Sequence, residues 1–238
     1  MRIFIENSSD MAFFKMKANR LEATVYTSTA LFVAASLLYF LPLNIPHRLA
    51  FPLIILTLSS MWLNPWQIML ALAFSAAGDW LGAEGLFIGQ MASFAVAHTF
   101  FILFFAKRYH VKVEPDRKLT AKAKGYTFMF IFMGAVLVIW TCLSIAPEAP
   151  EGIVRTGVII YTVIICAMLV MALLQRSSLF AIGAVLFVFS DLILAWNMFV
   201  EPVEGAGYLI MIPYYIGQWM LFVRSTPYRV PWLRRHRM

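Results

Sequence analysis

The sequence predicts an all-α integral membrane protein, a polytopic helical bundle of about eight transmembrane helices. Of its 238 residues, 62% are hydrophobic and only 13% are charged, and the mean hydropathy is +0.79. A soluble domain has about half apolar and a quarter charged residues, so this chain is too apolar for water. A spanning helix needs roughly 20 apolar residues, which leaves no room for a separate soluble domain.

Eight predominantly apolar stretches are the predicted helices. They lie at residues 22–43, 48–63, 66–83, 85–106, 125–146, 153–174, 178–200 and 207–224. The second and third are short, and the Asn64-Pro65 turn between them predicts a helical hairpin. Residues 21–224 therefore form one predicted transmembrane domain. Residues 1–20 lack the apolar core of a signal peptide and are expected to form a loose or surface-lying arm, while residues 225–238 form a basic tail.

Lysine and arginine are distributed unequally between the two ends of the predicted bundle. Seventeen of the 19 lie in the N-terminal arm, the connections after the fourth and sixth helices, and the tail, whereas Arg48 and Arg155 lie on the opposite side. Because positive residues stay in the cytoplasm, both termini are predicted to be cytoplasmic. We expect the protein to lie in the bacterial inner (plasma) membrane. The net charge of +7 is explained by these helix ends, so membrane lipids, and not nucleic acid, are the expected partners.

Two carboxylates lie inside the apolar stretches. Asp79 follows Gly78 in the third predicted helix, and Asp191 follows Ser190 in the seventh. A charge near the middle of a bilayer costs roughly 2.5 to 3.5 kcal/mol on insertion scales, which makes each a functional candidate. The structural alternative is that the two aspartates cap broken helices or pair with tyrosine hydroxyls. Ser75 precedes Asp79 by four residues and shares its helix face.

Depth along the predicted helices places several polar side chains at one level. At about 1.5 Å rise per residue, four lie roughly 6 to 14 Å below the outer helix ends: Asp79, Tyr214, Tyr161 and Asp191. His98 and Gln218 lie deeper, at about 18 Å. We expect a polar pocket in the outer half of the membrane, with His98 and Gln218 as its floor. The alternatives are a hydrogen-bonded core histidine, interfacial tyrosines, and serines that only pack helices.

The two aspartates also occupy equivalent positions in the two halves of the chain. Each lies on the third helix of a four-helix half, and both of these helices run in the same direction. This placement favours a 4+4 parallel duplication with the site between the halves.

Several motifs resemble a known family. They are Ser75-Ala76-Ala77-Gly78-Asp79, Gly89 and His98 on the next helix, Tyr161 followed by Met168, and Gly183-Ala184-x-Leu186-Phe187-x-x-Ser190-Asp191. In combination they closely resemble the YhhN family of membrane proteins, whose members include lysoplasmalogenases. The resemblance spans predicted helices 3 to 8. One departure is Pro46-His47-Arg48, where family members tend to carry Lys-Pro, although Arg48 could replace the charge.

This resemblance implies hydrolysis of the vinyl ether of a lysoplasmalogen to a fatty aldehyde and a glycerophospho-ethanolamine or -choline. Such a reaction needs one protonated and one ionised carboxyl. The deeper Asp191 is assigned as the acid and Asp79 as the base or ion-pair partner, and the reverse assignment stays open. The remaining substrate-binding candidates are Ser75, His98, Tyr161, Ser190, Tyr214 and Gln218. Helices 3, 4, 7 and 8 are expected to hold the alkenyl chain.

Two other classes of protein fit the sequence less well. A metal-dependent hydrolase needs three or four ligands, yet His98 is the one histidine inside a predicted helix, and Cys142 and Cys166 lie in apolar stretches. We therefore expect no metal and no cofactor. A lipid or small-molecule transporter or binding protein that uses the aspartate pair for proton coupling is the alternative function.

Overall fold

The computed structural model describes residues 8–112 and 121–228, and within them the chain is entirely helical, without a strand. Its eight α-helices are α1 (Ser8–Phe40), α2 (Phe51–Leu63), α3 (Trp66–Ala83), α4 (Phe87–Lys112), α5 (Ala121–Ser144), α6 (Ile153–Leu173), α7 (Ser178–Phe199) and α8 (Ala206–Ser225). Two 3₁₀ turns, η1 (Ala146–Glu148) and η2 (Thr226–Tyr228), follow α5 and α8. The predicted all-α class is confirmed.

Six of these helices are long and apolar enough to cross a membrane, namely α1, α4, α5, α6, α7 and α8. The other two form the predicted hairpin: α2 and α3 pack together, and Asn64 and Pro65 are the cap residues that separate them. Large apolar side chains such as Phe128 and Leu143 on α5 are exposed on the outside of the bundle. The chain is an integral membrane protein.

Several helix ends differ from the sequence prediction, and the starts of α1 and α2 differ for clear reasons. α1 begins at Ser8, so residues 8–20 continue the first helix where a loose arm was expected. No glycine or proline interrupts residues 8–40, which explains the long helix. α2 begins at Phe51 and not at residue 48, because His47 has a positive φ of 53° and Pro52 favours the first turn of a helix. Residues 1–7 and 229–238, including most of the predicted tail, lie outside the described part.

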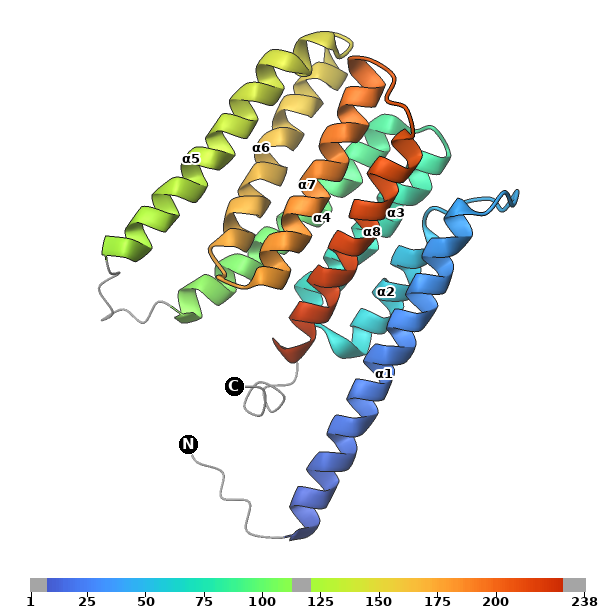
Figure 1. Cartoon of the computed structure of the whole chain (residues 1–238), viewed down its shortest axis with the longest axis vertical. Helices are drawn as coiled ribbons and strands as arrows, with labels where there is room; N and C mark the ends of the chain where they lie inside the picture. Colours follow the sequence, from blue (N-terminus) through green and yellow to red (C-terminus); the bar gives the residue numbers. More distant parts are fainter. Residues whose placement is uncertain (1–7, 113–120, 229–238) are drawn as a thin grey trace.

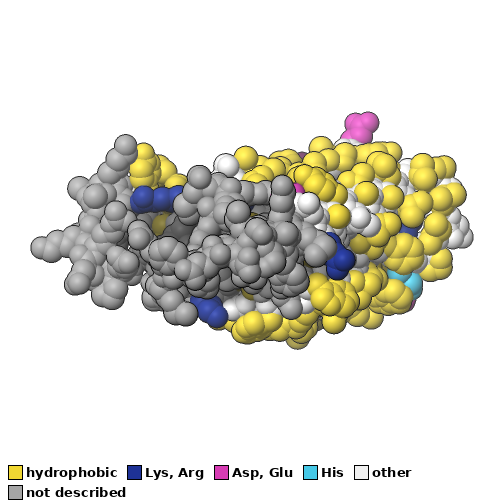
Figure 2. All heavy atoms as spheres, turned by 90° about the horizontal axis from the view of Figure 1, so that it is seen from below, with side chains coloured by type: hydrophobic (Ala, Val, Ile, Leu, Met, Phe, Trp, Pro, Cys, Tyr) yellow, Lys and Arg dark blue, Asp and Glu magenta, His cyan; other side chains and the backbone are white. Residues whose placement is uncertain are grey.

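The helices run alternately up and down, with α5 and α1 at opposite edges of the bundle (Figure 1). α1 begins and α8 ends at the lower end in this view, while the α3–α4 and α7–α8 connections lie at the upper end. Seen from the lower end, several Lys and Arg side chains are visible around the residues that the structure does not describe, and hydrophobic side chains surround them (Figure 2). The core between the helices contains the fully buried rings of Phe101, Phe105, Phe180, Phe187 and Phe222.

The order of helix neighbours is the same in both halves of the chain. In each half every helix packs against the next, and α3 with α4 and α7 with α8 form the most extensive contacts. Across the halves, α4 packs against α6 and α8 packs against α2.

Close approach of α7 and α8 depends on two glycines that face each other. A Cβ added to Gly217 would lie 2.7 Å from the carbonyl oxygen of Gly183, and one added to Gly183 would lie 3.1 Å from that of Gly217. Small residues at helix crossings allow backbones to approach in this way. The packing of these two glycines therefore fixes how near α8 comes to α7.

We expect Gly217→Ala to destabilise the protein by about 1 to 3 kcal/mol, as overpacking does, because backbone and not a flexible side chain must move. Thermal unfolding of the purified protein, followed by intrinsic fluorescence, would measure the change. Gly125→Ala is the matched control, since an added Cβ at Gly125 meets nothing within 4 Å. An unchanged unfolding temperature for Gly217→Ala would contradict the close crossing.

Candidate active site

Asp79 lies near the upper end of α3, where its carboxylate faces the interior of the bundle. It is 3% exposed, and the hydroxyl of Tyr214 on α8 donates a hydrogen bond to its Oδ2 at 2.9 Å. Gly78 makes room beside it, because a Cβ there would lie 2.9 Å from the ring of Phe94 on α4. Asp79 is thus held by one tyrosine in an apolar environment.

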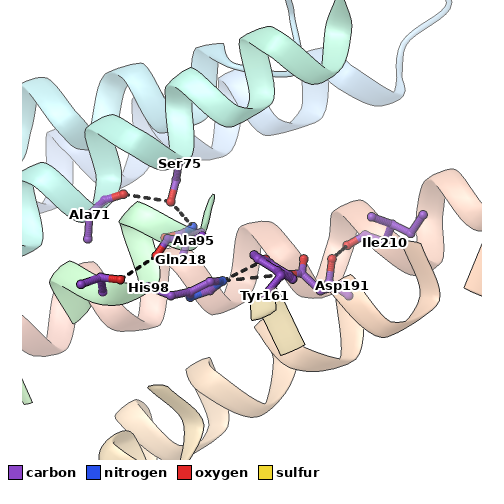
Figure 3. Close-up of polar contacts among 10 residues, drawn as sticks. Ala71, Ser75, Ala95, His98, Tyr161, Asp191, Ile210 and Gln218 are labelled. Carbon is purple, nitrogen blue, oxygen red and sulfur yellow. Dashed lines mark hydrogen bonds and ion pairs between the residues drawn. The ribbon is translucent and has the colours of Figure 1, made fainter. Parts of the chain in front are cut away.

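Asp191, on α7, is held by a row of two further side chains (Figure 3). The hydroxyl of Tyr161 on α6 donates to Asp191 Oδ2, and His98 Nε2 on α4 lies 3.0 Å from the Tyr161 oxygen. Since the Tyr161 hydrogen points to Asp191, its oxygen accepts from the Nε2–H of His98, which is therefore the assigned tautomer. His98 Nε2 also lies 3.8 Å from Asp191 Oδ2.

Ser190 connects α7 to α8 beside the carboxylates. Its hydroxyl donates to the carbonyl oxygen of Ile210 at 2.9 Å. Pro213 lies inside α8 one residue before Tyr214, and proline removes a backbone donor from a helix. Ser190 therefore adds a hydrogen bond from α7 in the part of α8 where Pro213 removes one backbone hydrogen bond.

Ser75 and Gln218 lie farther from the carboxylates and bond to each other. Gln218 Nε2 donates to Ser75 Oγ at 3.0 Å, and Ser75 donates in turn to the carbonyl oxygen of Ala71 at 2.9 Å. Both side chains are fully buried, and Figure 3 shows their hydrogen bonds apart from the row that leads to Asp191. Their hydrogen bond joins α3 to α8. Gln218 Oε1 and His98 Nδ1 have no hydrogen-bond partner within residues 8–112 and 121–228.

Both carboxylates open into one cavity near the upper end of the bundle. Its empty volume is about 740 Å³, which includes the space at its open mouth. Its lining residues come from α1, α3, α4, α7 and α8 and the connection before α2: Tyr39, Leu49, Asp79, Gly82, Gln90, Phe94, Ser190, Asp191, Leu194, Met198, Gly207, Ile210, Met211 and Tyr214. We call it the carboxyl cavity. Of the eight candidate residues, it contains Asp79, Asp191, Ser190 and Tyr214.

A second cavity adjoins the carboxyl cavity on the side of α5 and α6. Its empty volume is about 750 Å³, which also includes the space at its open mouth, and most of its lining side chains are apolar. Four residues line both cavities: Gln90, Phe94, Asp191 and Leu194. We call it the apolar cavity. Tyr161 lines this cavity and not the first, so its hydroxyl reaches Asp191 from the α6 side.

Gln90 and Tyr39 are cavity residues that the sequence reasoning missed. Gln90 on α4 lines both cavities, and its amide packs over Gly82, where an added Cβ would meet it at 2.7 Å. As a polar residue in an apolar stretch, Gln90 carries the same sequence signal that singled out His98. Tyr39 gives no such signal, because it lies at a helix end where tyrosine is common in membrane proteins.

Arg48 places a positive charge next to the wall of the carboxyl cavity. Its Nη1 donates to the carbonyl oxygens of Leu41 and Leu43, at 2.5 and 2.6 Å, and so holds the α1–α2 connection together. The guanidinium carbon lies 5.7 Å from the centre of the Tyr39 ring, which lines the cavity. A polar group that enters at Tyr39 would meet this charge.

Comparison with known proteins identifies the family. The model of the YhhN family matches residues 48–226. Proteins named lysoplasmalogenase TMEM86B are 30% identical, over 173 residues in Rattus norvegicus, 178 in Mus musculus and 165 in Homo sapiens. These matches cover 72%, 73% and 68% of this chain, and 65%, 68% and 64% of the three relatives. The chain thus spans about two thirds of the length of these relatives.

No solved structure matches the chain significantly. The match of the family model extends over α2 to α8 and includes both aspartates, both tyrosines and His98. On that match, the chain belongs to the YhhN family.

Proposed function

We propose that this protein is a membrane hydrolase that cleaves the vinyl ether bond of a lysoplasmalogen. The products would be a fatty aldehyde and a glycerophospho-ethanolamine or -choline. The observation that carries this proposal is the pair of carboxyls that face one cavity, each bonded to a tyrosine from another helix. The relatives named lysoplasmalogenase support it as well.

The two carboxyls match the chemistry of an enol ether. Protonation of the β-carbon forms a C–H bond and leaves an oxocarbenium ion at the α-carbon. Water then adds to the α-carbon and gives up a proton, which forms a hemiacetal. The hemiacetal hydroxyl loses its proton as the bond between the α-carbon and the glycerol oxygen breaks, and the glycerol oxygen takes up a proton, so that the aldehyde and the glycerol alcohol are released. One carboxyl must donate the first proton while the other stays ionised to stabilise the cation and accept a proton from water, as in glycosidases.

The surroundings of the two carboxyls support a particular division of these roles. Asp79 is 3% exposed and has one tyrosine donor, whereas the side chain of Asp191 is 12% exposed and lies beside both Tyr161 and His98. Burial favours the neutral acid and hydrogen-bond donors favour the carboxylate. We therefore propose Asp79 as the proton donor and Asp191 as the ionised partner. This reverses the sequence-based assignment, which used depth along the helix and could not include hydrogen bonds.

The remaining candidates have supporting roles. Tyr161 and Tyr214 orient the two carboxyls, and His98 fixes Tyr161 through its Nε2–H. Ser190 holds α8 against α7. Ser75 and Gln218, which lie outside the carboxyl cavity, hold α3 against α8 and act on the site only through the position of those helices.

Replacement of either carboxyl should abolish most of the turnover. We expect Asp79→Asn and Asp191→Asn each to lower aldehyde release from a vinyl-ether lysolipid by roughly 10² to 10⁴, the usual contribution of one acid/base group. Aldehyde release by the purified protein is the measurement, and it also separates an enzyme from a proton-coupled transporter. Glu204→Gln, the same change at an exposed upper connection, is the matched control.

Near-normal aldehyde release by both asparagine variants would refute the two-carboxyl mechanism. The corresponding acyl-ester lysolipid should stay intact, because the proposed site has no activated nucleophile. Ester cleavage at a comparable rate would instead point to Ser190 as a nucleophile, since its hydroxyl lies in the carboxyl cavity.

A metal-dependent mechanism would need a different set of side chains. The described residues contain no group of three or more His, Cys, Asp or Glu side chains that could hold a metal ion. His98, Asp191 and Tyr161 bond among themselves. The proposed acid/base scheme therefore uses this chain's own carboxyls throughout.

Chelation followed by dialysis should accordingly leave the rate of aldehyde release unchanged. A rate measured before treatment, after treatment and after re-addition of zinc would test this expectation. Loss of activity that zinc alone restores would replace the acid/base scheme with attack by metal-bound water.

We also propose that the two four-helix halves are parallel repeats and that the site lies between them. Supporting this, the order of neighbours is the same in both halves, and Asp79 and Asp191 lie on the equivalent helices α3 and α7. Each receives its hydrogen bond from a tyrosine on a helix of the second half.

We propose further that all eight helices lie in the membrane with both termini in the cytoplasm. Cysteines placed at the exposed Glu148 and Glu204 should react with an impermeant thiol reagent on intact cells, in a background without Cys142 and Cys166. A cysteine at Arg176, on the lower connection between α6 and α7, should react only after lysis. The opposite labelling pattern would invert the topology.

A further inference from the structure

The apolar cavity extends from the site of the proposed chemistry toward the middle of the bundle. On that side its lining includes Ile165 and Cys166 on α6, together with Leu137 on α5 and Val188 on α7. From Asp191 and Tyr161 the lining continues downward to Cys166, five residues beyond Tyr161, which is about 7.5 Å along the helix. Below Asp191 and Tyr161, the cavity wall on α6 and α7 is thus built almost entirely from apolar groups.

Two polar groups on the α6 wall of this path already have hydrogen-bond partners. Thr162 Oγ1 donates to the carbonyl oxygen of Val158 at 2.8 Å, and the Tyr161 hydroxyl donates to Asp191. A polar ligand would find no directed partner below Asp191, whereas a hydrocarbon chain would bury apolar surface there without cost to any hydrogen bond.

We infer that the apolar cavity holds the hydrocarbon chain of a single-chain ether lipid whose polar head lies in the carboxyl cavity. The inference rests on the proposed function and names the binding mode at the same site. The two cavities share Asp191 and Gln90 as lining residues, so a ligand that occupies both places the bond between head and chain at Asp191. The chain then runs down between α4, α5, α6 and α7. This differs from the expectation that α3, α4, α7 and α8 hold it.

α5 forms the wall of this cavity that faces the lipid. It lies at the edge of the bundle and packs mainly against α6 (Figure 1). Its Trp140 stacks on Trp196 of α7, with ring centres 5.9 Å apart and planes at 9°. A chain longer than the cavity would therefore leave its lower end toward the membrane interior and not toward water.

A photoreactive lipid tests the position of the chain without any turnover. The probe is a saturated alkyl-ether lysophospholipid with a diazirine in mid-chain, incubated with the purified wild-type protein, irradiated and mapped by mass spectrometry. We expect cross-links at Leu137, Ile165, Cys166 or Val188, suppressed by excess unlabelled lysolipid. Cross-links that map to α3 and α8, around Met211, would overturn the inference.

Chain-length selectivity gives a second, independent test. Cys166→Phe should narrow the path below Tyr161, so kcat/KM for a hexadecenyl substrate should fall at least tenfold while that for a hexenyl substrate is retained. Cys142→Phe, the same change at a residue that lines neither cavity, should preserve both. If Cys166→Phe lowers kcat/KM equally for both substrates, or for neither, the inference is contradicted.

The two experiments also separate this inference from the proposed function. If the protein releases no aldehyde from any vinyl-ether lysolipid, the hydrolase proposal fails, yet cross-links along the apolar cavity would still support the chain site. If aldehyde is released but the cross-links lie elsewhere, the chain site fails and the hydrolase proposal stands.

Discussion

The need to satisfy two carboxyls inside an apolar bundle governs the arrangement of the helices. A carboxylate in hydrocarbon is costly unless it receives hydrogen bonds. Here the donors come from other helices: Tyr214 on α8 for Asp79 on α3, and Tyr161 on α6 for Asp191 on α7. These bonds require α3 to face α8 and α6 to face α7 at one level. Gly78, Gly183 and Gly217 provide the close crossings around them.

Two similar carboxyls acquire different properties because their neighbours differ. Asp79 sits against the Phe94 side of the core with one hydroxyl donor, whereas Asp191 lies where two cavities meet and His98 reinforces its tyrosine. Under the proposed mechanism, a repeated architecture would supply an acid and a base from equivalent positions. The difference arises from α4, where His98 bonds to the tyrosine that holds Asp191.

The sequence was sufficient to predict the helical class and the polar residues that bond to one another inside the bundle. Hydropathy alone located the helices, and the cost of intramembrane charge singled out Asp79 and Asp191. Depth along a helix correctly grouped Tyr161 and Tyr214 with them, because hydrogen-bond partners must lie at similar levels. It could not show that Gln218 bonds to Ser75 instead, or that the apolar cavity lies beside α5 and α6, since both depend on how helices turn about their axes.

The shortness of α2 has a consequence for the surrounding lipid. Its 13 residues are about 20 Å long, whereas the hydrocarbon core of a bilayer is about 30 Å thick. Asn64, at its lower end, is fully buried and donates to the carbonyl oxygen of Phe222 and to Ser225. This turn can therefore lie within the hydrocarbon layer without exposing its side-chain amide to lipid. Hydrophobic mismatch would thin the leaflet beside the hairpin. Thinning there would bring the phosphates of the lower leaflet closer to the Asn64 turn, at the opposite end of α3 from Asp79.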